Sequence, residues 1–340
     1  MKIIKVKASK DYQITVSNGF DYFQQNVMPI ITGDTVAVIT DSNVEPLYFE
    51  QLKSLLKDKK VFKYVIEAGE QSKNAENYVK IVNAFAKLNL SRKATVIALG
   101  GGVVGDLSAF VASTYMRGVK YVAIPTTLLS MVDSSIGGKT GIDLDAGKNL
   151  IGTFFQPDAV YINTQFIKTL PEREIISGFG EIMKYAFIDS RITTNDLKSI
   201  DYFNLIVKSL EIKRDIVEED EKESGKRMLL NFGHTVGHAL EKLYNYELSH
   251  GECVIKGMYY SLNASYKLGY LEKSEYQKAV DFLKLSGVTV ANDFTKEEIL
   301  SVIKSDKKAD GDSVNFVFTK GFGRAFIEKI KFVKVMENIL

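Results

Sequence analysis

The sequence predicts an α/β N-terminal domain with a Rossmann-like doubly wound parallel sheet, followed by a mainly α-helical C-terminal domain. In the first half of the chain, short apolar runs alternate with helical stretches of ~10–15 residues, a pattern typical of such sheets. Beyond Pro171 the apolar residues recur with a helical period instead. The length of 340 residues is long for a single core and suits two domains, which we place at 1–172 and 173–340.

The predicted strands of the first domain follow one another in a regular order. Two short strands at 3–6 and 12–16 form a hairpin at a sheet edge. The run V-A-V-I-T-D at 36–41 is apolar up to its final acid, as in a strand buried on both faces. Further strands are predicted at 61–66, 95–99, 121–124 and 159–162, with helices at 46–56 and 74–88. Since parallel sheets bind ligands at the carboxyl ends of their strands, the segments after these strands are candidate ligand loops.

The segment G-G-G-V-V-G-D at 100–106 contains a G-x-G-x-x-G pattern directly after a strand. Glycines here let the backbone approach a pyrophosphate, and the following helix N-terminus favours an anion. The match departs from the usual dinucleotide fingerprint, because it follows a third central strand and no acid lies ~20 residues further on. Asp41, at the end of the first buried strand, is an alternative partner for the ribose hydroxyls. Glu70 and Lys73 flank the loop after the second strand, where a functional pair and a solvated pair are equally good interpretations.

Two polar segments follow the strand at 121–124. The segment P-T-T-L-L-S-M-V-D-S-S-I-G-G-K-T-G spans 125–141, and D-L-D-A-G-K-N spans 143–149. Ordinary turn chemistry explains residues of these types. Each segment, however, places a lysine behind glycine, Lys139 in the first and Lys148 in the second. This repetition indicates positive charge that is held rigidly at an anion.

Several charged side chains in the helical half of the chain lie at positions where the sequence allows either a surface role or a role in a site. Glu181 and Lys184 are three residues apart on one helix face, where a surface ion pair is the ordinary interpretation. Lys213 shares the apolar face of a helix predicted at 203–220, so it either reaches out to water or needs an anion inside. The acidic run that closes this helix ends at Glu223, the one member of the run that we single out.

The three histidines of the chain lie within one short region. His234 and His238 are four residues apart in the run L-L-N-F-G-H-T-V-G-H, so a helix projects both from one face, which Glu241 continues. An imidazole pair at this spacing holds one metal ion, or supplies one ligand and a neighbouring acid or base. For an arbitrary pair, chance sharing of a face is the more frequent explanation. We favour a metal site because the remaining histidine, His250, lies close by in a second glycine-bearing segment.

The remaining segments complete the second domain. A helix is predicted at 251–268, a turn at 305–311, and a final hairpin at 314–318 and 325–330 that covers a sheet edge. The chain therefore offers a dinucleotide-binding sheet, a metal site and many separated cations, which implies a substrate with at least two anionic groups. These cations are Lys139, Lys148, Lys184, Lys213, Arg227 and Lys307 or Lys308.

The composition excludes several classes of function. Lys and Arg number 44 against 42 Asp and Glu, and a net charge of +2 without a basic block excludes a nucleic-acid partner. The longest apolar tract is interrupted by Asp106 and by glycines, so no membrane span is expected, and the first residues lack the apolar core of a signal peptide. The single cysteine, Cys253, cannot form an intrachain disulfide, so we expect a cytoplasmic location.

From Asp41 to about Lys308 the sequence resembles the 3-dehydroquinate synthase family of sugar-phosphate cyclases. In the first half the resemblance rests on the segments T-D-S-N, G-E-Q-S-K, L-G-G-G-V-V-G-D, P-T-T, D-S-S-I-G-G-K, G-K-N and T-L-P, in this order. The second half adds G-E-I-M-K, N-F-G-H-T-V-G-H and H-G-E. So many ordered matches make chance agreement negligible. The resemblance implies a dehydroquinate synthase-like fold.

The resemblance also implies a carbon–oxygen lyase of the shikimate pathway, which leads to chorismate and the aromatic amino acids. Such an enzyme converts 3-deoxy-D-arabino-heptulosonate 7-phosphate to 3-dehydroquinate and phosphate. The steps are transient oxidation, phosphate elimination, reduction, ring opening and aldol closure. The implied cofactors are NAD+, which is regenerated in each turnover, and one divalent metal ion, Zn2+ or Co2+. A homodimer is the implied assembly.

The functional residues of the family carry over to matching positions of this sequence. The resemblance implies metal ligands at Glu181, His234 and His250. It makes His238 an acid/base group or substrate contact with Glu223 as a relay partner, and it gives catalytic roles to Lys184 and Lys213. The implied cofactor contacts are Asp41, Asn43, Glu70, Lys73, Gly101, Gly102, Val103, Asp106, Thr126, Thr127, Lys148, Phe166 and Thr169. The implied substrate contacts are Arg117, which reaches in from a partner subunit, Asp133, Lys139, Asn149, Lys184, Lys213, Arg227, Asn231, His250 and Lys307, with Lys308 as the alternative to Lys307.

Three other functions fit parts of the same pattern. A related cyclase that acts on another phosphorylated sugar needs no carboxylate-binding pair, so Arg227 and the inward Lys213 argue against it. A metal-dependent polyol dehydrogenase of the glycerol dehydrogenase type is the main alternative, and it differs by accumulating NADH. The third alternative is a non-enzymatic NAD-binding regulator, and the complete metal site argues against it.

Overall fold

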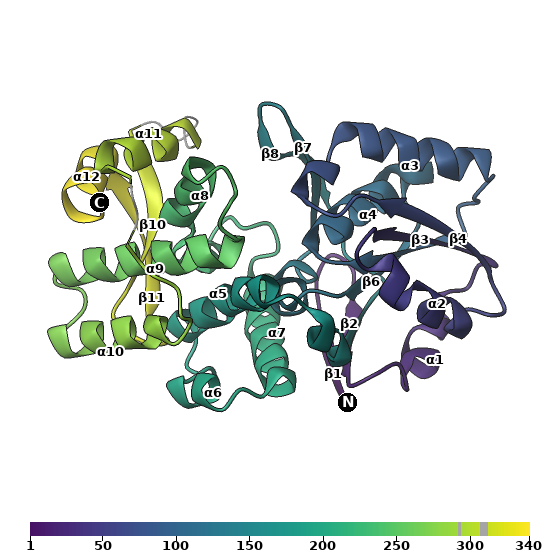
Figure 1. The fold of residues 1–340 in the computed structure, drawn as a ribbon, viewed down its shortest axis with the longest axis horizontal. Coiled ribbons are helices and arrows are strands. Elements are labelled where there is room, and N and C mark those ends of the chain that lie inside the picture. The colour runs from purple at the N-terminus through teal and green to yellow at the C-terminus, as the bar shows by residue number, and fades with distance from the viewer. Residues whose placement is uncertain (292–293, 307–311) are drawn as a thin grey trace. The chain divides into compact units, whose positions relative to one another are not determined.

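The computed structural model describes residues 1–291, 294–306 and 312–340 of the chain (Figure 1). Contacts between residues divide the chain into two compact units. Unit 1 comprises Met1–Leu170 with Lys213–Glu221, and unit 2 comprises Pro171–Ile212 with Lys222–Leu340. The predicted substrate residue Lys307 and its alternative Lys308 lie outside the described residues.

A seven-stranded sheet forms the centre of unit 1, with the strand order β1-β2-β9-β6-β5-β3-β4. Its strands are β1 (Lys2–Val6), β2 (Tyr12–Ser17), β3 (Thr35–Asp41), β4 (Lys60–Ile66), β5 (Thr95–Gly100), β6 (Lys120–Pro125) and β9 (Ala159–Asn163). Neighbouring strands are parallel except in the predicted hairpin β1–β2 at the edge. Strands β3, β5 and β9 are buried along almost their whole length, as their continuous apolar sequences require.

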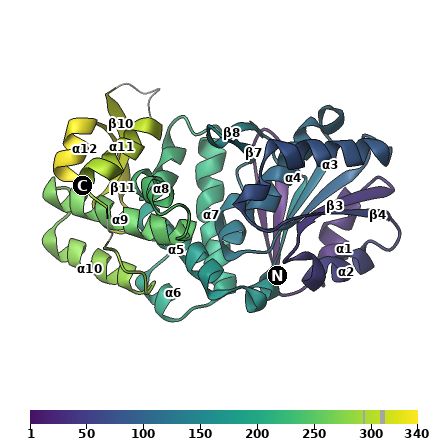
Figure 2. The same cartoon turned by 45° about the horizontal axis from the view of Figure 1, so that its top comes forward.

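Crossover helices cover both faces of this sheet. They are α1 (Phe23–Asn26), α2 (Glu45–Leu55), α3 (Ala75–Lys87) and α4 (Gly102–Thr114). The chain runs from β3 outward to β4 and then returns past β3 to β5 and β6, so the direction of winding reverses. Because such connections are right-handed, α2 covers one face while α3 and α4 cover the other (Figure 2). A sheet of this kind places its ligand site at the switch point, outside the carboxyl ends of β3 and β5.

The end of the first lysine-bearing segment, from Lys139, forms a β-hairpin with the second segment and the residues that follow it. Its antiparallel strands are β7 (Lys139–Leu144) and β8 (Gly147–Phe154). Thr140 faces Thr153 across the hairpin, and their hydroxyl oxygens lie 2.9 Å apart. β-Branched residues on both strands favour the extended backbone. The many glycines and polar residues of these segments make this strand preference hard to recognise in the sequence.

Unit 2 is mainly helical. Its helices are α5 (Glu172–Ile188), α6 (Thr194–Lys198), α7 (Tyr202–Glu219), α8 (His234–Leu243), α9 (His250–Lys267), α10 (Lys273–Lys284), α11 (Lys296–Asp306) and α12 (Phe332–Asn338). The last part of α7, from Lys213, belongs to unit 1. Helix α9 packs against α5, α8 and α10 (Figure 1). Within the described ranges, none of the helices is both long and apolar enough to cross a membrane.

The predicted C-terminal hairpin belongs to this helical unit. Strands β10 (Ser313–Thr319) and β11 (Ala325–Lys331) form a two-stranded antiparallel sheet of their own. Phe316 and Phe318 are buried in one core with Leu240 of α8 and Ile299 of α11. The alternation of apolar residues predicted the strands, but it does not encode which distant element their apolar face meets.

Candidate functional site

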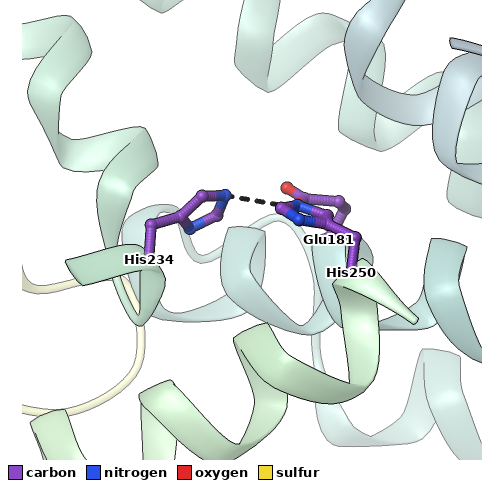
Figure 3. Close-up of side chains that lie close together, drawn as sticks. All are labelled: Glu181, His234 and His250. Atoms are coloured by element: carbon purple, nitrogen blue, oxygen red, sulfur yellow. Dashed lines mark hydrogen bonds and ion pairs between the residues drawn. The ribbon is translucent and has the colours of Figure 1, made fainter. Parts of the chain in front are cut away.

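Three side chains of unit 2 converge on one point (Figure 3). Glu181 lies in α5, while His234 begins α8 and His250 begins α9. Glu181 Oε1 lies 2.9 Å from His250 Nε2 and 3.3 Å from His234 Nε2. One potential ligand atom from each residue lies within 4.8 Å of the other two, a spacing that a single metal ion can bridge. These are the residues that the family resemblance implies as metal ligands.

Glycines allow the three helices to meet at this point. A Cβ atom at Gly251, next to His250, would lie 2.1 Å from the backbone oxygen of Ser177 in α5. A Cβ atom at Gly257 would lie 1.9 Å from the backbone oxygen of Gly233, which immediately precedes His234. No side chain fits at such distances, so α9 crosses α5 and α8 with backbone against backbone. The ligands therefore converge because their helices do.

A capping box fixes the first turn of α9 and with it the position of His250. The Ser249 hydroxyl accepts the backbone N–H of Glu252 at 3.4 Å, and the Glu252 carboxylate accepts the backbone N–H of Ser249 at 2.7 Å. This reciprocal pair satisfies two backbone donors that a helix start otherwise leaves open. The short motif S-H-G-E thus supplies the cap, the histidine and the crossing glycine together.

Buried charges in this cluster compensate one another. Glu181 and Lys184 are each 1% exposed and form an ion pair, so their interpretation as a surface pair is wrong. Burial alone would raise the pKa of Glu181, but Lys184 and the two imidazoles hold it well below its usual range. Burial alone would lower the pKa of His250, but hydrogen bonds to Glu181 and Glu241 raise it to about 10. The site therefore favours positive charge beside the ionised Glu181, as a metal cation would provide.

His238 lies beside the cluster. Its ring centroid is 5.2 Å from that of His234 and 6.0 Å from that of His250. His238 also forms a second group of potential metal ligands with Glu241 and His250. Because His250 belongs to both groups, one ion bound at His250 uses either Glu181 and His234 or His238 and Glu241.

Two further predicted residues of unit 2 meet just before α8. Asn231 Nδ2 donates a hydrogen bond to Glu223 Oε1 at 2.9 Å. Glu223 has a φ of 61°, a left-handed conformation that costs a non-glycine residue about 1–3 kcal/mol and is concentrated at functional sites. Arg227, between them in sequence, is 2% exposed. A guanidinium so far from water is suited to bind carboxylate or phosphate strongly.

The register of the large sheet brings predicted cofactor segments of unit 1 together. Thr40, next to Asp41, pairs with Leu99 at the start of the glycine segment. Gly100 in turn pairs with Pro125, which precedes Thr126 and Thr127. Segments far apart in the sequence therefore reach one edge of the sheet side by side. Asp41 Oδ1 accepts the backbone N–H of Asn43 at 2.9 Å, so these two predicted residues are also in contact.

Lys73 is the centre of a charged network at the same edge. Its Nζ lies 2.8 Å from Glu70, 3.4 Å from Asp106 and 3.8 Å from Asp143. Lys148 joins the network 3.7 Å from Glu70. Burial would lower the pKa of Lys73, but its acidic neighbours raise it, whereas burial raises the pKa of Asp106 to about 6 against the effect of Lys73. The predicted residues Glu70, Lys73, Asp106 and Lys148 are thus one electrostatic unit.

Lys213 points inward, the second of the two alternatives that its place on an apolar helix face allows. It is 5% exposed, and its Nζ donates to the backbone oxygen of Asp133 at 2.7 Å and lies 3.0 Å from the Asp133 carboxylate. Asp133 itself belongs to a short π-helical turn, Ser130–Ser134, a conformation that is frequent at functional sites. Two predicted substrate residues of unit 1 are therefore in direct contact.

The other predicted residues occupy more varied positions. Arg117 and Lys139 are exposed, in a helical turn after α4 and at the start of β7. Phe166 is buried against Tyr48 at a ring-centroid distance of 4.4 Å, so its side chain belongs to the core. The hydroxyl of Thr169 makes a hydrogen bond with that of Tyr48. Gly102 and Val103 form the first turn of α4.

Some residues of these sites were not identified from the sequence. Asp143 accepts the backbone N–H of Asn149 at 2.8 Å, where Asn149 has a φ of 56°, and it also reaches Lys73. Its signal was the aspartate-rich turn D-L-D-A-G-K-N. The crossing glycines Gly251 and Gly257 carry no comparable signal, because their role depends on which backbone lies opposite.

Solved structures with the same architecture show the fold class of the chain. One is a 2-deoxy-scyllo-inosose synthase complexed with carbaglucose-6-phosphate, NAD+ and Co2+, with a TM-score of 0.91, 21% identity and coverage of 99% of both chains. A 2-epi-5-epi-valiolone synthase from Streptomyces hygroscopicus subsp. jinggangensis 5008, with NAD+ and Zn2+ bound, has a TM-score of 0.87 at 25% identity, covering 98% of this chain and 97% of that one. A probable glycerol dehydrogenase from Sinorhizobium meliloti 1021 has a TM-score of 0.66 at 14% identity, covering 96% and 94%. The predicted dehydroquinate synthase-like fold is confirmed.

Sequence comparison narrows this class to one family. The family model for the 3-dehydroquinate synthase N-terminal region matches residues 63–177, and the C-terminal model matches residues 178–309. The 3-dehydroquinate synthase of Clostridium acetobutylicum is 39% identical over 97% of both chains, and that of Thermoanaerobacter pseudethanolicus is 42% identical over 94% of both. The chain belongs to the 3-dehydroquinate synthase family. The predicted activity, a phosphate-eliminating conversion of 3-deoxy-D-arabino-heptulosonate 7-phosphate to 3-dehydroquinate, is confirmed, and the glycerol dehydrogenase alternative is not favoured.

Proposed function

We propose that the chain catalyses the family reaction with NAD+ bound at the carboxyl edge of the unit 1 sheet and one divalent metal ion held by Glu181, His234 and His250. The observation that carries this proposal is the convergence of the His234 and His250 imidazoles on the buried carboxylate of Glu181. In terms of the sequence, the proposed cofactor domain is 1–172, and the proposed metal- and substrate-binding domain is 173–340.

The donor set of the cluster fits Zn2+ or Co2+. One carboxylate oxygen and two imidazole nitrogens are common ligands of a catalytic ion, which keeps a further position for substrate. Of the two synthases compared above, one was solved with Co2+ and the other with Zn2+. When bound, such an ion acts as a Lewis acid toward substrate oxygens. Glu181, which stays ionised, and the two histidines are the residues that would hold it.

The carboxyl edge of the unit 1 sheet fits a dinucleotide. Among the described residues, the buried hydroxyl of Thr126 has no hydrogen-bond partner, so it is available to a polar ligand. A Cβ atom at Gly101 would lie 2.8 Å from Thr127, and α4 begins at Gly102 with backbone N–H groups that favour phosphate. Both synthases were solved with NAD+. When bound, NAD+ accepts a hydride from a substrate carbinol and returns it within the same turnover.

Buried cations support a phosphorylated sugar acid as the substrate. Lys184 and Arg227 in unit 2 and Lys213 in unit 1 are almost fully buried, where charge interacts with an anionic group more strongly than in water. The inosose synthase was solved with carbaglucose-6-phosphate. In unit 1 the proposed substrate contacts are Asp133, Lys139, Asn149 and Lys213, with Arg117 contributed by a partner subunit. In unit 2 they are Lys184, Arg227, Asn231 and His250, together with Lys307.

His238 is the proposed acid/base group. An imidazole exchanges protons readily near neutral pH, and His238 lies beside both histidine ligands of the proposed ion. Glu223 is the proposed relay partner, and its hydrogen bond from Asn231 orients the carboxylate. We further propose a cytoplasmic homodimer, for which the single cysteine and the family relationship are the support.

A single assay tests the proposed function. The purified chain is incubated with 3-deoxy-D-arabino-heptulosonate 7-phosphate, a catalytic amount of NAD+ and Zn2+, and both released phosphate and the nicotinamide absorbance band are followed. We expect phosphate to accumulate over many turnovers per NAD+ without a net rise in NADH, because the hydride returns to the product. The same preparation with glycerol in place of the heptulosonate phosphate is expected to form no NADH.

Two results would contradict this function. Absence of phosphate release from the metal-loaded chain would exclude the elimination, and stoichiometric build-up of NADH would indicate a dehydrogenase. A preparation treated with a metal chelator is the matched control, and we expect it to lose phosphate release and to regain it when Zn2+ is restored.

A further inference from the structure

The imidazole of His250 lies between two carboxylates that come from different helices. On one side, Nε2 lies 2.9 Å from Glu181 Oε1, at the cluster proposed above as the metal site. On the other side, Nδ1 lies 3.0 Å from Glu241 Oε1, on α8. The Glu241 side chain is only 12% exposed, so water competes little for this hydrogen bond.

His234 has the same orientation with a different acceptor. Its Nδ1 lies 3.2 Å from the backbone oxygen of Phe232, while its Nε2 faces Glu181. In both histidines, therefore, Nδ1 faces an oxygen acceptor and Nε2 faces the ligand position. A neutral imidazole carries one ring proton, and an acceptor at Nδ1 holds that proton there, which leaves the Nε2 lone pair for an ion.

We propose that Glu241 is a positioning residue, which holds His250 as the Nδ1–H tautomer and fixes its ring so that Nε2 is the metal ligand. This inference rests on the proposed metal site. A carboxylate behind a ligating histidine orients the ring and strengthens it as a donor, and losing such a partner weakens metal binding by about 10–100-fold. The other histidine ligand uses a backbone oxygen for this purpose, so Glu241 is the partner that mutation can remove.

The competing role for Glu241 is direct coordination. Glu241, His238 and His250 also have potential ligand atoms within 4.8 Å of one another. In that arrangement Glu241 would bind the ion itself. In the proposed positioning role Glu241 contacts only His250 and does not bind the ion. The shared orientation of His234 and His250 toward the buried Glu181 favours the positioning role.

Metal-binding measurements separate these roles. The wild type, Glu241→Gln, Glu241→Ala and the control Glu247→Gln, an exposed carboxylate in the loop before α9, are loaded with Co2+. We expect one ion per chain in all four and unchanged affinity in Glu247→Gln. In Glu241→Ala, competition with a chelator should show affinity weaker by about 10–100-fold. The Gln variant should lose less, because its amide oxygen still accepts from Nδ1–H, and the visible Co2+ spectrum should retain its intensity because no ligand is lost.

A spectroscopic readout reports the tautomer directly. The chain has only three histidines, so the ring nitrogens of 15N-histidine-labelled, Zn2+-loaded protein can be assigned by comparing single variants. We expect His250 to show a protonated Nδ1 in the wild type. In Glu241→Ala the Nδ1 proton should exchange faster with water and its signal should broaden, a change that a purely structural role for Glu241 would not cause.

Several outcomes overturn the inference. Unchanged Co2+ affinity in both Glu241 variants, or a protonated Nε2 on His250 in the Zn2+-loaded wild type, excludes the positioning role. Loss of stoichiometric Co2+ binding with an altered spectrum in Glu241→Gln makes Glu241 a ligand instead. A wild type that binds no ion overturns the metal site itself. Glu181→Gln removes a proposed ligand, so wild-type Co2+ binding in this variant would show that the ion binds elsewhere.

Discussion

His238 and His250 lie at the same cluster but are expected to fail in different ways when they are replaced. His250→Ala removes a proposed ligand, so we expect metal content and activity to be lost together. His238→Ala leaves Glu181, His234 and His250 in place, so it should keep the metal while turnover falls by about 10²–10⁴-fold through loss of acid/base catalysis. Metal analysis and phosphate release on the same preparations measure both effects. An equal loss of metal from His238→Ala would show that His238 is a ligand.

At the level of single residues, the sequence predicts that a metal site is present, but not which residues from different helices form it. The spacing of His234 and His238 indicates one shared helix face, and on its own this spacing favours both as ligands of one ion. It cannot identify Glu181, which belongs to another helix and lies 3.3 Å from His234 Nε2 only because the helices cross. The family resemblance supplied that residue. The burial of Glu181 beside Lys184 was also hidden, because a glutamate–lysine pair three residues apart looks the same on a surface.

At the level of helices, the close crossings of α9 predict that Gly→Ala substitutions destabilise the protein more at the crossings than at an open position. Gly257→Ala places a Cβ atom against the backbone of Gly233, and Gly251→Ala places one against Ser177. The backbone of Gly233 leads directly into His234, and that of Ser177 belongs to α5, which carries Glu181. Since neither backbone can move without displacing a proposed ligand, we expect each variant to lose about 3 kcal/mol or more of stability and to weaken metal binding. Gly269→Ala is the control, because its Cβ atom meets nothing within 4 Å and only its φ of 76° opposes alanine, at a cost of about 1–2 kcal/mol.

Chemical denaturation and Co2+ titration of the three variants check this prediction. Wild-type metal affinity in Gly251→Ala and Gly257→Ala would show that the ligand geometry does not depend on the helix crossings. A Gly269→Ala variant as unstable as the other two would show that glycine backbone freedom, and not close packing, explains the effect.

The elements themselves were largely predictable, and the exceptions share a physical cause. The strands β3 and β5 have continuous apolar runs, and the helices α3 and α9 have apolar residues at a helical period. All four lie within a residue or two of the predicted ranges. The sequence predicts no strand ranges for the hairpin β7–β8, because its pairing involves threonines and glycines instead of a regular apolar face. The final hairpin was recognised, but its burial against α8 and α11 depends on contacts between elements far apart in the sequence.

At the level of the whole molecule, the implied role of Arg117 depends on whether the chain forms a dimer. It is exposed in a turn where Met116, Arg117 and Gly118 all have positive φ, at 52°, 64° and 115°. Two consecutive non-glycine residues in this conformation cost about 1–3 kcal/mol each, and such strain persists where function uses it. A turn that displays an arginine at this cost is consistent with the implied role of Arg117 in a partner subunit.

Mixing of two inactive variants tests that role. Arg117→Ala and His250→Ala are each expected to be inactive as pure preparations. If Arg117 serves the neighbouring site of a two-fold dimer, a mixed dimer carries both defects in one site and none in the other. Random pairing of equal amounts should then restore up to about a quarter of wild-type phosphate release. If Arg117 serves its own subunit, every site in a mixed dimer carries one defect and no activity returns, and a monomeric chain gives the same result. Recovery on mixing, with size-exclusion chromatography of the same samples, therefore requires both a dimer and an arginine that acts across its interface.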